Sequence, residues 1–407
     1  MLSTAFGRPS AQSSQFQDSY AFLNNFYHFD ERVRDPDFTV SSFEEIWQEI
    51  PHHYLKAANL VAIPKFMGEH LAVEDLLNLA DRRRFIQVMV KNLPCWEDRA
   101  LVTTLDGTMG VLDLISARKS FARMGIMLSP EFKKIWEEKV VSAMGRCELD
   151  ADTLGSVLCC YAGDAEIPSP HVGVAFKKNT RFLVNTGEFL RLPHIVNAMR
   201  SCAILNACGE KTFTPHIAHT LFAGFPVERL KNPFLLTKLQ QSCLWFDMPF
   251  NNDAALDELS ISRMERELRS VFHEAGYPYM ERAIKGFDHR VDLTFRGAQN
   301  KNTMVEIDGP QHFVFARDPQ TGECIMAGLN GATVFQSALI TKMAVNAVLL
   351  RLPFRLVDTI LHHTTQVKQN FVEFVMESGR VFSPGSYFVN NARDRGYVVE
   401  PLVPAAA

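Results

Sequence analysis

Residues 305–313 read VEIDGPQHF, and this stretch decides the fold of the second half of the chain. Side chains along a β-strand alternate between two faces, so Glu306 and Asp308 share one face and the apolar residues beside them share the other. Two carboxylates on one face repel each other and are costly to desolvate. A divalent cation, a basic partner such as Lys342 or Arg290, or solvent exposure at the end of the strand would each offset that cost.

The segments around this stretch predict an α/β module that runs from about Ser262 to Leu361. A capping-box pattern at 262–265 begins a helix that ends near Ala275. The rest of the module is expected to contain strands at 289–295 and 303–308, a Gly-rich surface loop at 318–330, a helix at about 334–350 and a short strand at 354–357. Helices alternating with strands in this order are typical of the α/β class.

A third carboxylate, Asp292, joins the first two if the strands at 289–295 and 303–308 form an antiparallel hairpin. Asp292, Glu306 and Asp308 would then form a hard-oxygen site of the kind that Mg²⁺ occupies in phosphodiester hydrolysis. Mg²⁺ is the one cofactor that this pattern suggests. The alternative is a scaffold in which the same carboxylates cap turns and bond backbone amides.

The stretch 305–313 resembles the core signature of the RAP domain, V-E-[VI]-D-G-P-x-H-F, which follows a strand with H-x-V-D. HRVD at 289–292 matches that strand, and 331–342 resembles the Gly-x-Thr…Lys segment of the family. Residues 351–357 stand where the family has its closing strand, although Leu352-Pro353 replace the usual Gly-Tyr. The resemblance covers the whole module.

This resemblance implies a restriction-endonuclease-like fold, most similar to the very short patch repair type. In that fold an Asp and a Glu or Gln on adjacent strands hold the metal, and Asp292 and Glu306 match these positions. Asp308 stands where the general nuclease pattern has a Lys, and Lys342 on the following helix could supply the missing charge. If the module cleaves nucleic acid, the resemblance therefore implies these four residues as the catalytic group.

The region upstream, 31–258, is predicted to be all-helical. Similar amphipathic segments recur around small residues that are roughly 40 positions apart. This period is in the range of two-helix solenoid repeats. The small residues are Ala117, Cys160, Cys202 and Cys243. Proteins with RAP domains commonly carry helical repeats upstream, as octotricopeptide repeat proteins and the Fas-activated serine/threonine kinase family do. The alternative is an irregular helical bundle whose helices are similar only because they are all amphipathic.

Any contact with nucleic acid must come from a local patch, because the chain has a net charge of −4. The basic run Lys177, Lys178 and Arg181 is the candidate patch in the helical region, although such a run is often only a solvated helix end. The candidate contacts in the α/β module are Arg290, Gln311 and His312. His312 could contact a phosphate or transfer a proton, or it could be a hydrogen-bonded structural residue.

The composition, 47% apolar and 22% charged, is that of a folded protein. The eight cysteines form no C-x-x-C pair and are expected to be reduced core residues. No window is long and apolar enough for a membrane span, which predicts a soluble intracellular protein, cytoplasmic or organellar. Residues 1–30 are expected to be a disordered or targeting tail, 260–375 the α/β domain, and 376–407 a loop-rich tail.

The sequence favours an RNA-binding protein that acts in RNA processing or stability, with helical repeats that grip single-stranded RNA and a C-terminal module that contacts or processes it. One rival is a Mg²⁺-dependent endonuclease. Another is a helical scaffold or effector that binds a protein partner. A positive groove on the helical region would indicate RNA, whereas an apolar or acidic groove would indicate protein.

Overall fold

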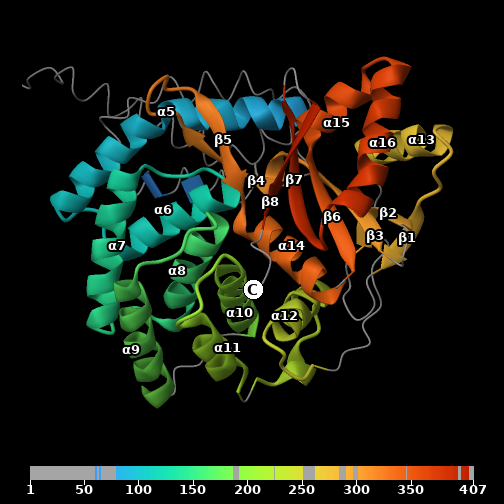
Figure 1. Cartoon of the computed structure of the whole chain (residues 1–407). Helices are drawn as coiled ribbons and strands as arrows, with labels where there is room; N and C mark the ends of the chain where they lie inside the picture. Colours follow the sequence, from blue (N-terminus) through green and yellow to red (C-terminus); the bar gives the residue numbers. More distant parts are fainter. Residues whose placement is uncertain are drawn as a thin grey trace, which may run out of the picture.

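The computed structural model describes residues 60–61, 64–65, 79–186, 192–223, 225–250, 262–283, 290–296, 301–344, 346–392 and 396–402. The predicted tail at 1–30 lies outside these residues. The described part contains twelve α-helices and eight β-strands. The helices come first and a mixed sheet with its own helices follows, so the fold is α plus α/β, as the sequence predicts (Figure 1).

The first half consists of helices and has two layers. Its helices are α5 (Leu79–Leu105), α6 (Val111–Met124), α7 (Pro130–Gly145), α8 (Ala151–Gly163), α9 (Pro170–Thr186), α10 (Leu192–Ala207), α11 (Thr214–Phe222) and α12 (Pro233–Trp245). Helices α6, α8, α10 and α12 pack against one another in succession, while α7, α9 and α11 pack on the other side of this row. The row therefore forms an inner layer that faces the sheet, with α14 packed against α10 and α8.

Side-chain caps explain where several of these helices begin. Ser129, Asp150 and Asn232 precede α7, α8 and α12, and each side chain accepts the backbone N–H three residues further on. Such a cap satisfies one of the backbone donors that the first turn of a helix leaves unpaired. Proline follows the cap in α7 and α12, where its fixed φ suits the first helical position.

The second half is built around one six-stranded sheet. The strands are β1 (Met280–Ala283), β2 (Arg290–Arg296), β3 (Asn302–Asp308), β6 (Ala347–Pro353), β7 (Gly385–Ala392) and β8 (Gly396–Pro401), paired in the order β1-β2-β3-β6-β7-β8. β6 is parallel to both β3 and β7, and the other neighbours are antiparallel. The helices of this half are α13 (Arg263–Glu274), α14 (Gly331–Met343), α15 (Phe354–Leu361) and α16 (Thr365–Val381).

The two faces of the sheet belong to different cores. Met304 and Leu349 point to the face that packs on α14 and the helical half, and they belong to the larger core, which also contains residues of α5 to α12. Val305 and Leu350 point to the opposite face, where a smaller core forms with α13, α15 and α16. The helical half therefore shares its core with the sheet.

The predicted strands at 289–295 and 303–308 are confirmed as β2 and β3, and the predicted first helix as α13. Ser262 caps that helix through the N–H of Glu265, at 3.1 Å. The prediction for 334–357 is wrong in its boundaries: the helix ends at Met343, 347–353 form strand β6, and 354–361 form helix α15. Every residue of β6 is buried. Because both faces of β6 are buried, its polar and apolar residues do not alternate. Its apolar run therefore fits a helix as well as a strand.

Two regions predicted as loops contain strands. The insertion at 318–330 is part of a hairpin of β4 (Phe313–Arg317) and β5 (Cys324–Leu329), which packs against α5 (Figure 1). β4 also bonds to the turn after α6, where the Phe315 N–H donates to the Gly125 carbonyl at 2.6 Å. The expected loop-rich tail at 376–407 instead supplies the end of α16 and strands β7 and β8.

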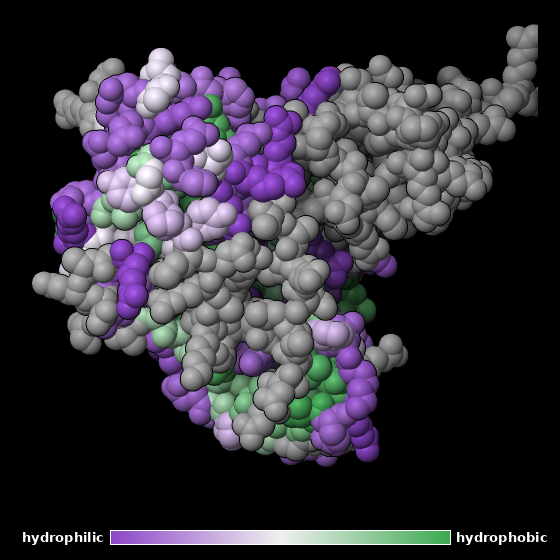
Figure 2. Space-filling model, turned by 90° about the vertical axis from the view of Figure 1, so that its right-hand side faces the viewer, coloured by the Kyte–Doolittle hydropathy of each residue, from purple (hydrophilic) through white to green (hydrophobic). Residues whose placement is uncertain are grey.

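The surface of the described residues is mostly hydrophilic on the upper part of the side shown in Figure 2, with hydrophobic residues gathered at its lower end. The exposed apolar side chains of the helical half include Val174, Phe182 and Phe234. Across the described ranges, no helix combines the length and apolar character that crossing a membrane requires.

Candidate functional site

Asp292 lies at the end of the β2–β3 ladder, beside Glu306. The last cross-strand pair is Leu293 with Val305, so Asp292 and Glu306 occupy the next position along the two strands. The Asp292 Oδ2 atom accepts the backbone N–H of Ile307 at 2.7 Å. This bond fixes the carboxylate between the strands, and the predicted approach of Asp292 to Glu306 is observed.

The environment of Asp292 raises the pKa of its carboxyl to about 8, first because the group is buried and next because Glu306 is a second negative charge. Glu265 adds to this effect, whereas the bond from the Ile307 N–H and the charge of Arg351 oppose it. Asp292 and Glu306 therefore hold a proton between them more readily than two isolated carboxyls would. A cation at this pair would displace that proton.

Asp308 forms a buried ion pair with Arg351 of the neighbouring strand β6. Arg351 Nε donates to Asp308 Oδ2 at 2.8 Å and Nη2 donates to Oδ1, and both side chains are fully buried. A third donor, Arg351 Nη1, bonds Ser337 Oγ of α14 at 3.1 Å. Both oxygens of Asp308 are thus already bonded, and Arg351 supplies the charge that the sequence-based prediction assigned to Lys342.

Lys342 lies elsewhere, which corrects its predicted place in the carboxylate cluster. Its Nζ atom bonds Asp247 Oδ1 at 2.7 Å and the carbonyl oxygens of Leu244 and Trp245, at the C-terminal end of α12. Lys342 is in the last turn of α14, so it reaches the helical half rather than the sheet. The prediction missed Arg351 as the partner of Asp308 because it ended the helix at 350 and began the strand at 354, whereas β6 spans 347–353.

His312 and Gln311 follow Asp308 in a short turn. His312 Nδ1 lies 3.0 Å from Thr333 Oγ1 and 3.4 Å from Asp308 Oδ1, and about a quarter of its side chain is exposed (27%). The Gln311 carbonyl accepts a bond from Asn330 Nδ2 at 2.6 Å. The His312 imidazole therefore lies next to the buried Asp308–Arg351 pair and is itself partly exposed to solvent. Arg290 is the first residue of β2, and its side chain lies outside the described part.

The structure therefore brings Asp292 and Glu306 together and gives Asp308 a different partner. In the ranges that the structure describes, no group of three or more His, Cys, Asp and Glu residues has the geometry of a metal site. Arg269 of α13 contacts the backbone beside these acids. It pairs with Glu265, and its Nη2 donates to the Asp292 carbonyl at 3.0 Å.

The predicted basic run lies on α9, in the outer layer of the helical half. Lys177, Lys178 and Arg181 line a surface groove together with the exposed Val174 and Phe182. Lys178 Nζ donates to the carbonyl oxygen of Gly145 at 2.5 Å. The three cations are brought together, but α9 packs on α7 and α8 and not on the sheet.

A second groove, which the sequence analysis missed, crosses the inner layer of helices. It has a volume of about 480 Å³, within the range of pockets that hold small ligands, about 300–1,000 Å³. Its lining is Lys119, Ala122 and Arg123 of α6, Asp152, Gly155, Ser156, Cys159 and Gly163 of α8, His194 and Asn197 of α10, and Lys238 of α12.

Basic side chains outnumber acidic ones in this inner groove. Three of its residues are Lys or Arg, and its only acid, Asp152, bonds His194 Nδ1 at 3.0 Å. A usable signal was present in the sequence, because Ser156, Asn197 and Lys238 are each 41 residues apart. Aligning the recurring phrases at this spacing would have placed the three residues in one column.

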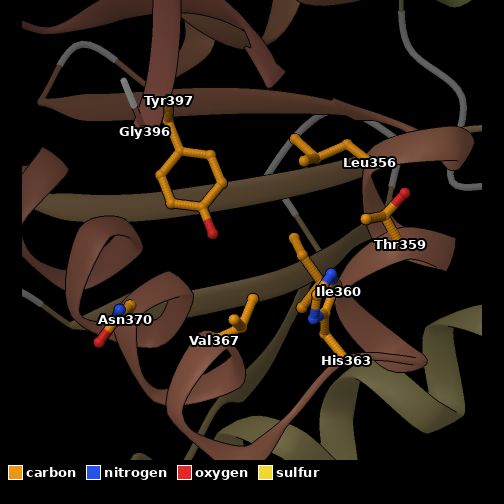
Figure 3. Close-up of a pocket in the computed structure, with 8 residues that line it drawn as sticks. All are labelled: Leu356, Thr359, Ile360, His363, Val367, Asn370, Gly396 and Tyr397. Carbon is orange, nitrogen blue, oxygen red and sulfur yellow. The ribbon is translucent and has the colours of Figure 1, made fainter. Parts of the chain in front are cut away.

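A third cavity, of about 220 Å³, lies between α15, α16 and β8 (Figure 3). Its walls are mainly apolar, and the Tyr397 ring extends into it towards Ile360 and Val367. The lining contains one histidine, His363, and no acid. This composition does not provide the paired titratable groups that acid–base chemistry needs.

No family model matches the chain, and no curated protein matches it either.

Proposed function

We propose that this protein binds single-stranded RNA along the inner layer of its helical half, and that a RAP-like C-terminal module contacts or processes the bound strand. The protein would then act in RNA processing or stability. The inner groove is the observation that carries the proposal, since its Lys and Arg side chains outnumber its single acid. A protein-binding scaffold would be expected to present an apolar or acidic groove there.

The spacing of the helices supports the repeat part of the proposal. Helices α6, α8, α10 and α12 begin at residues 111, 151, 192 and 233, which are 40, 41 and 41 residues apart. Each stacks on the next, and α7, α9 and α11 connect them. Stacked helix pairs of this length are typical of solenoid repeats, which present equivalent positions of successive helices along one face. An extended single strand fits such a face.

The order of elements in the C-terminal half supports the RAP resemblance. The antiparallel pair β2–β3 carries Asp292 and Glu306 side by side, followed by the turn with His312 and then by helix α14 and strand β6. The parallel pairing of β3 with β6 is compatible with a restriction-endonuclease-like sheet. Asp308 and Arg351 act in this proposal as a structural pair that holds β3 to β6.

The test is a binding titration of the whole chain with a fluorescent 20-nucleotide single-stranded RNA, its duplex and the corresponding DNA, at several salt concentrations. A protein that neutralises phosphates of a single strand loses affinity with a log–log slope of about −0.7 per phosphate. We expect a slope of about −2 or steeper for the single strand, since three or more cations line or border the groove. A slope near zero, or equal affinity for the duplex, contradicts the proposal.

A second candidate function, a Mg²⁺-dependent endonuclease, is favoured by one observation, the approach of Asp292 to Glu306. The residues present fit a divalent ion only in part, because Asp308 is occupied by Arg351. Incubation of labelled RNA and DNA with Mg²⁺ or with chelator tests this candidate. Cleavage that needs Mg²⁺ and disappears in Glu306→Ala supports a nuclease, whereas binding without cleavage supports the RNA-binding protein alone.

A further inference from the structure

Three cations of the inner layer have no carboxylate partner within the described part of the chain. Arg200 Nη1 bonds the neutral Gln241 Oε1 at 2.5 Å, and its guanidinium lies 4.1 Å from the centre of the Phe335 ring. Lys238 Nζ lies 4.4 Å from the centre of the Phe234 ring. Lys119 Nζ donates to Ser156 Oγ at 2.9 Å. Hydroxyl, amide and ring partners hold these groups in place but leave their charge uncompensated.

The fully buried arginines of the described chain are neutralised by acids. Arg351 pairs with Asp308, Arg269 with Glu265, and Arg118 with Asp164 and Glu166. Removing a cation from water costs several kcal/mol unless an opposite charge compensates it. The fold follows this rule at its fully buried arginines, whereas Lys238 in the groove and Arg200 beside it are partly exposed and have no acid partner among the described residues.

The charge of Arg200 acts on Lys238. Arg200 is densely surrounded by protein atoms although part of its surface stays exposed, and burial lowers its pKa to about 9. Burial also lowers the pKa of Lys238, and the charges of Arg200 and Arg123 lower it further. An anion placed between these groups would relieve both the burial cost and the repulsion.

The groove offers neutral hydrogen-bonding groups beside the cations. Ser156 and Asn197 line it between Lys119 and Lys238. Gly155 also lines it, and a Cβ atom there would make only an ordinary contact with the Cβ of Ala198 in α10, at 3.8 Å. Tetrahedral oxyanions are commonly bound by such a mixture of cations, hydroxyls and amides.

We propose that Lys119 and Lys238, which line the α6–α12 groove, form a phosphate-binding subsite with Arg200 beside Lys238, and that this subsite holds one phosphodiester group of a nucleic-acid strand. This subsite adds detail to the proposed function. The assignment of the bound strand as RNA rests on that function. The phosphate chemistry itself rests on the uncompensated cations. A free phosphate would satisfy the same groups, so the experiment must separate the two sources.

The test uses the whole chain with two probes, inorganic phosphate and the oligonucleotide U8. The variants are Arg200→Met and Lys238→Met, and the matched control is Lys139→Met, an exposed lysine of α7. Without ligand, we expect Arg200→Met to raise the midpoint of thermal unfolding, because it removes a buried uncompensated charge. With ligand, we expect both variants to bind about tenfold more weakly, since each loses a charge-assisted hydrogen bond. The control should bind as the wild type does.

The slope of log affinity against log salt concentration is a second measurement. Replacing a residue with a purely structural role would not change this slope. Each variant should reduce the steepness of the slope for U8 by about 0.7, the value for one phosphate contact in a single strand. U8 binding that inorganic phosphate at equal concentration does not displace supports a strand phosphodiester. Equal affinity for both probes supports the subsite with free phosphate as its ligand.

The inference is overturned if both variants bind both probes with wild-type affinity and slope. In that case RNA binding by the wild type would still support the proposed function, with its contacts elsewhere. Conversely, phosphate binding that the variants abolish, without any affinity of the wild type for RNA, would leave the subsite in place and remove the proposed function. Comparing Lys238→Met with Arg200→Met guards against loss of folding in either one.

Discussion

The buried pair of Asp308 and Arg351 makes a prediction at the level of single residues. Both side chains are fully buried and joined by two hydrogen bonds. Removing one partner of such a pair leaves a buried charge without compensation, which costs about 3–5 kcal/mol. Arg351→Met and Asp308→Leu should each lower the free energy of unfolding by this amount, measured by denaturation in urea.

The double variant of these residues provides the control. Replacing both partners by apolar residues leaves no uncompensated charge, and such replacements are often neutral or stabilising. We therefore expect Asp308→Leu with Arg351→Met to be more stable than either single variant. A double variant whose destabilisation equals the sum of the two single ones would show that the pair does not act as a unit.

The raised pKa of Asp292 predicts how the free energy of unfolding depends on pH. Burial and the charge of Glu306 raise the pKa of its carboxyl from 3.8 to about 8. In the window from about pH 4 to about pH 8 the folded state therefore binds more protons at this residue than the unfolded state, so its contribution to stability is lost as the pH rises. Urea titrations of the wild type and of Asp292→Asn between pH 5 and pH 8 measure this contribution.

We expect the free energy of unfolding to fall less steeply with pH in Asp292→Asn, whose amide oxygen can still accept the Ile307 N–H. Asp318→Asn is the matched control, because Asp318 is on a turn and the N–H groups of Gln320 and Thr321 lower its pKa. That control should have the wild-type pH dependence throughout this window. If the free energy of unfolding falls equally steeply with pH in the wild type and in Asp292→Asn, the pKa of Asp292 is not raised.

At the level of elements, the position of α14 depends on a glycine. A Cβ atom at Gly331 would lie 1.9 Å from the carbonyl oxygen of Ala162 in α8 and 2.7 Å from Cγ2 of Ile204 in α10. Gly331→Ala must therefore move α14 away from the inner helices, and overpacking of this kind costs about 1–3 kcal/mol. Gly328→Ala, where a Cβ meets nothing within 4 Å, is the control. Thermal unfolding of both variants tests the close approach.

Strands in which polar and apolar residues alternate could be predicted from the sequence even where they are buried, whereas a nearly continuous apolar run could not be distinguished from a helix. β3 was recognised because the pair Glu306 and Asp308 alternates with apolar residues. β6 was not, because it is a nearly continuous apolar run. Its Arg351, the partner of Asp308, was overlooked for the same reason. Polar partners of a buried strand become visible only when tertiary packing brings them together.

The inner groove was missed for a different physical reason. Lys119, Asn197 and Lys238 are on three different helices, and each is a polar position of an amphipathic segment, which is normally interpreted as solvated. The basic run at 177–181 was conspicuous in the sequence because its charges are adjacent along the chain. Stacking of helices, not adjacency in the chain, gathers the charges of the groove.

At the scale of the whole molecule, the two halves are joined through one core. The larger core contains Leu205 of α10 as well as Leu349 of β6, and the smaller core lies on the other face of the same sheet. The bonds between β4 and the turn after α6 add backbone contacts to this junction. Movement of the helical groove relative to the sheet would therefore disrupt buried packing.

This shared core predicts that the described chain unfolds in one cooperative transition. Leu205→Ala removes buried side-chain volume from the helical half, and Leu350→Ala does so on the far face of the sheet; each should cost about 2–5 kcal/mol. Because the sheet belongs to both cores, calorimetry should show a single transition that each variant shifts as a whole. Val381→Ala, at a side chain that is 66% exposed, should leave it unchanged. Two transitions, of which each variant lowers only one, would mean that the halves fold independently despite their common core.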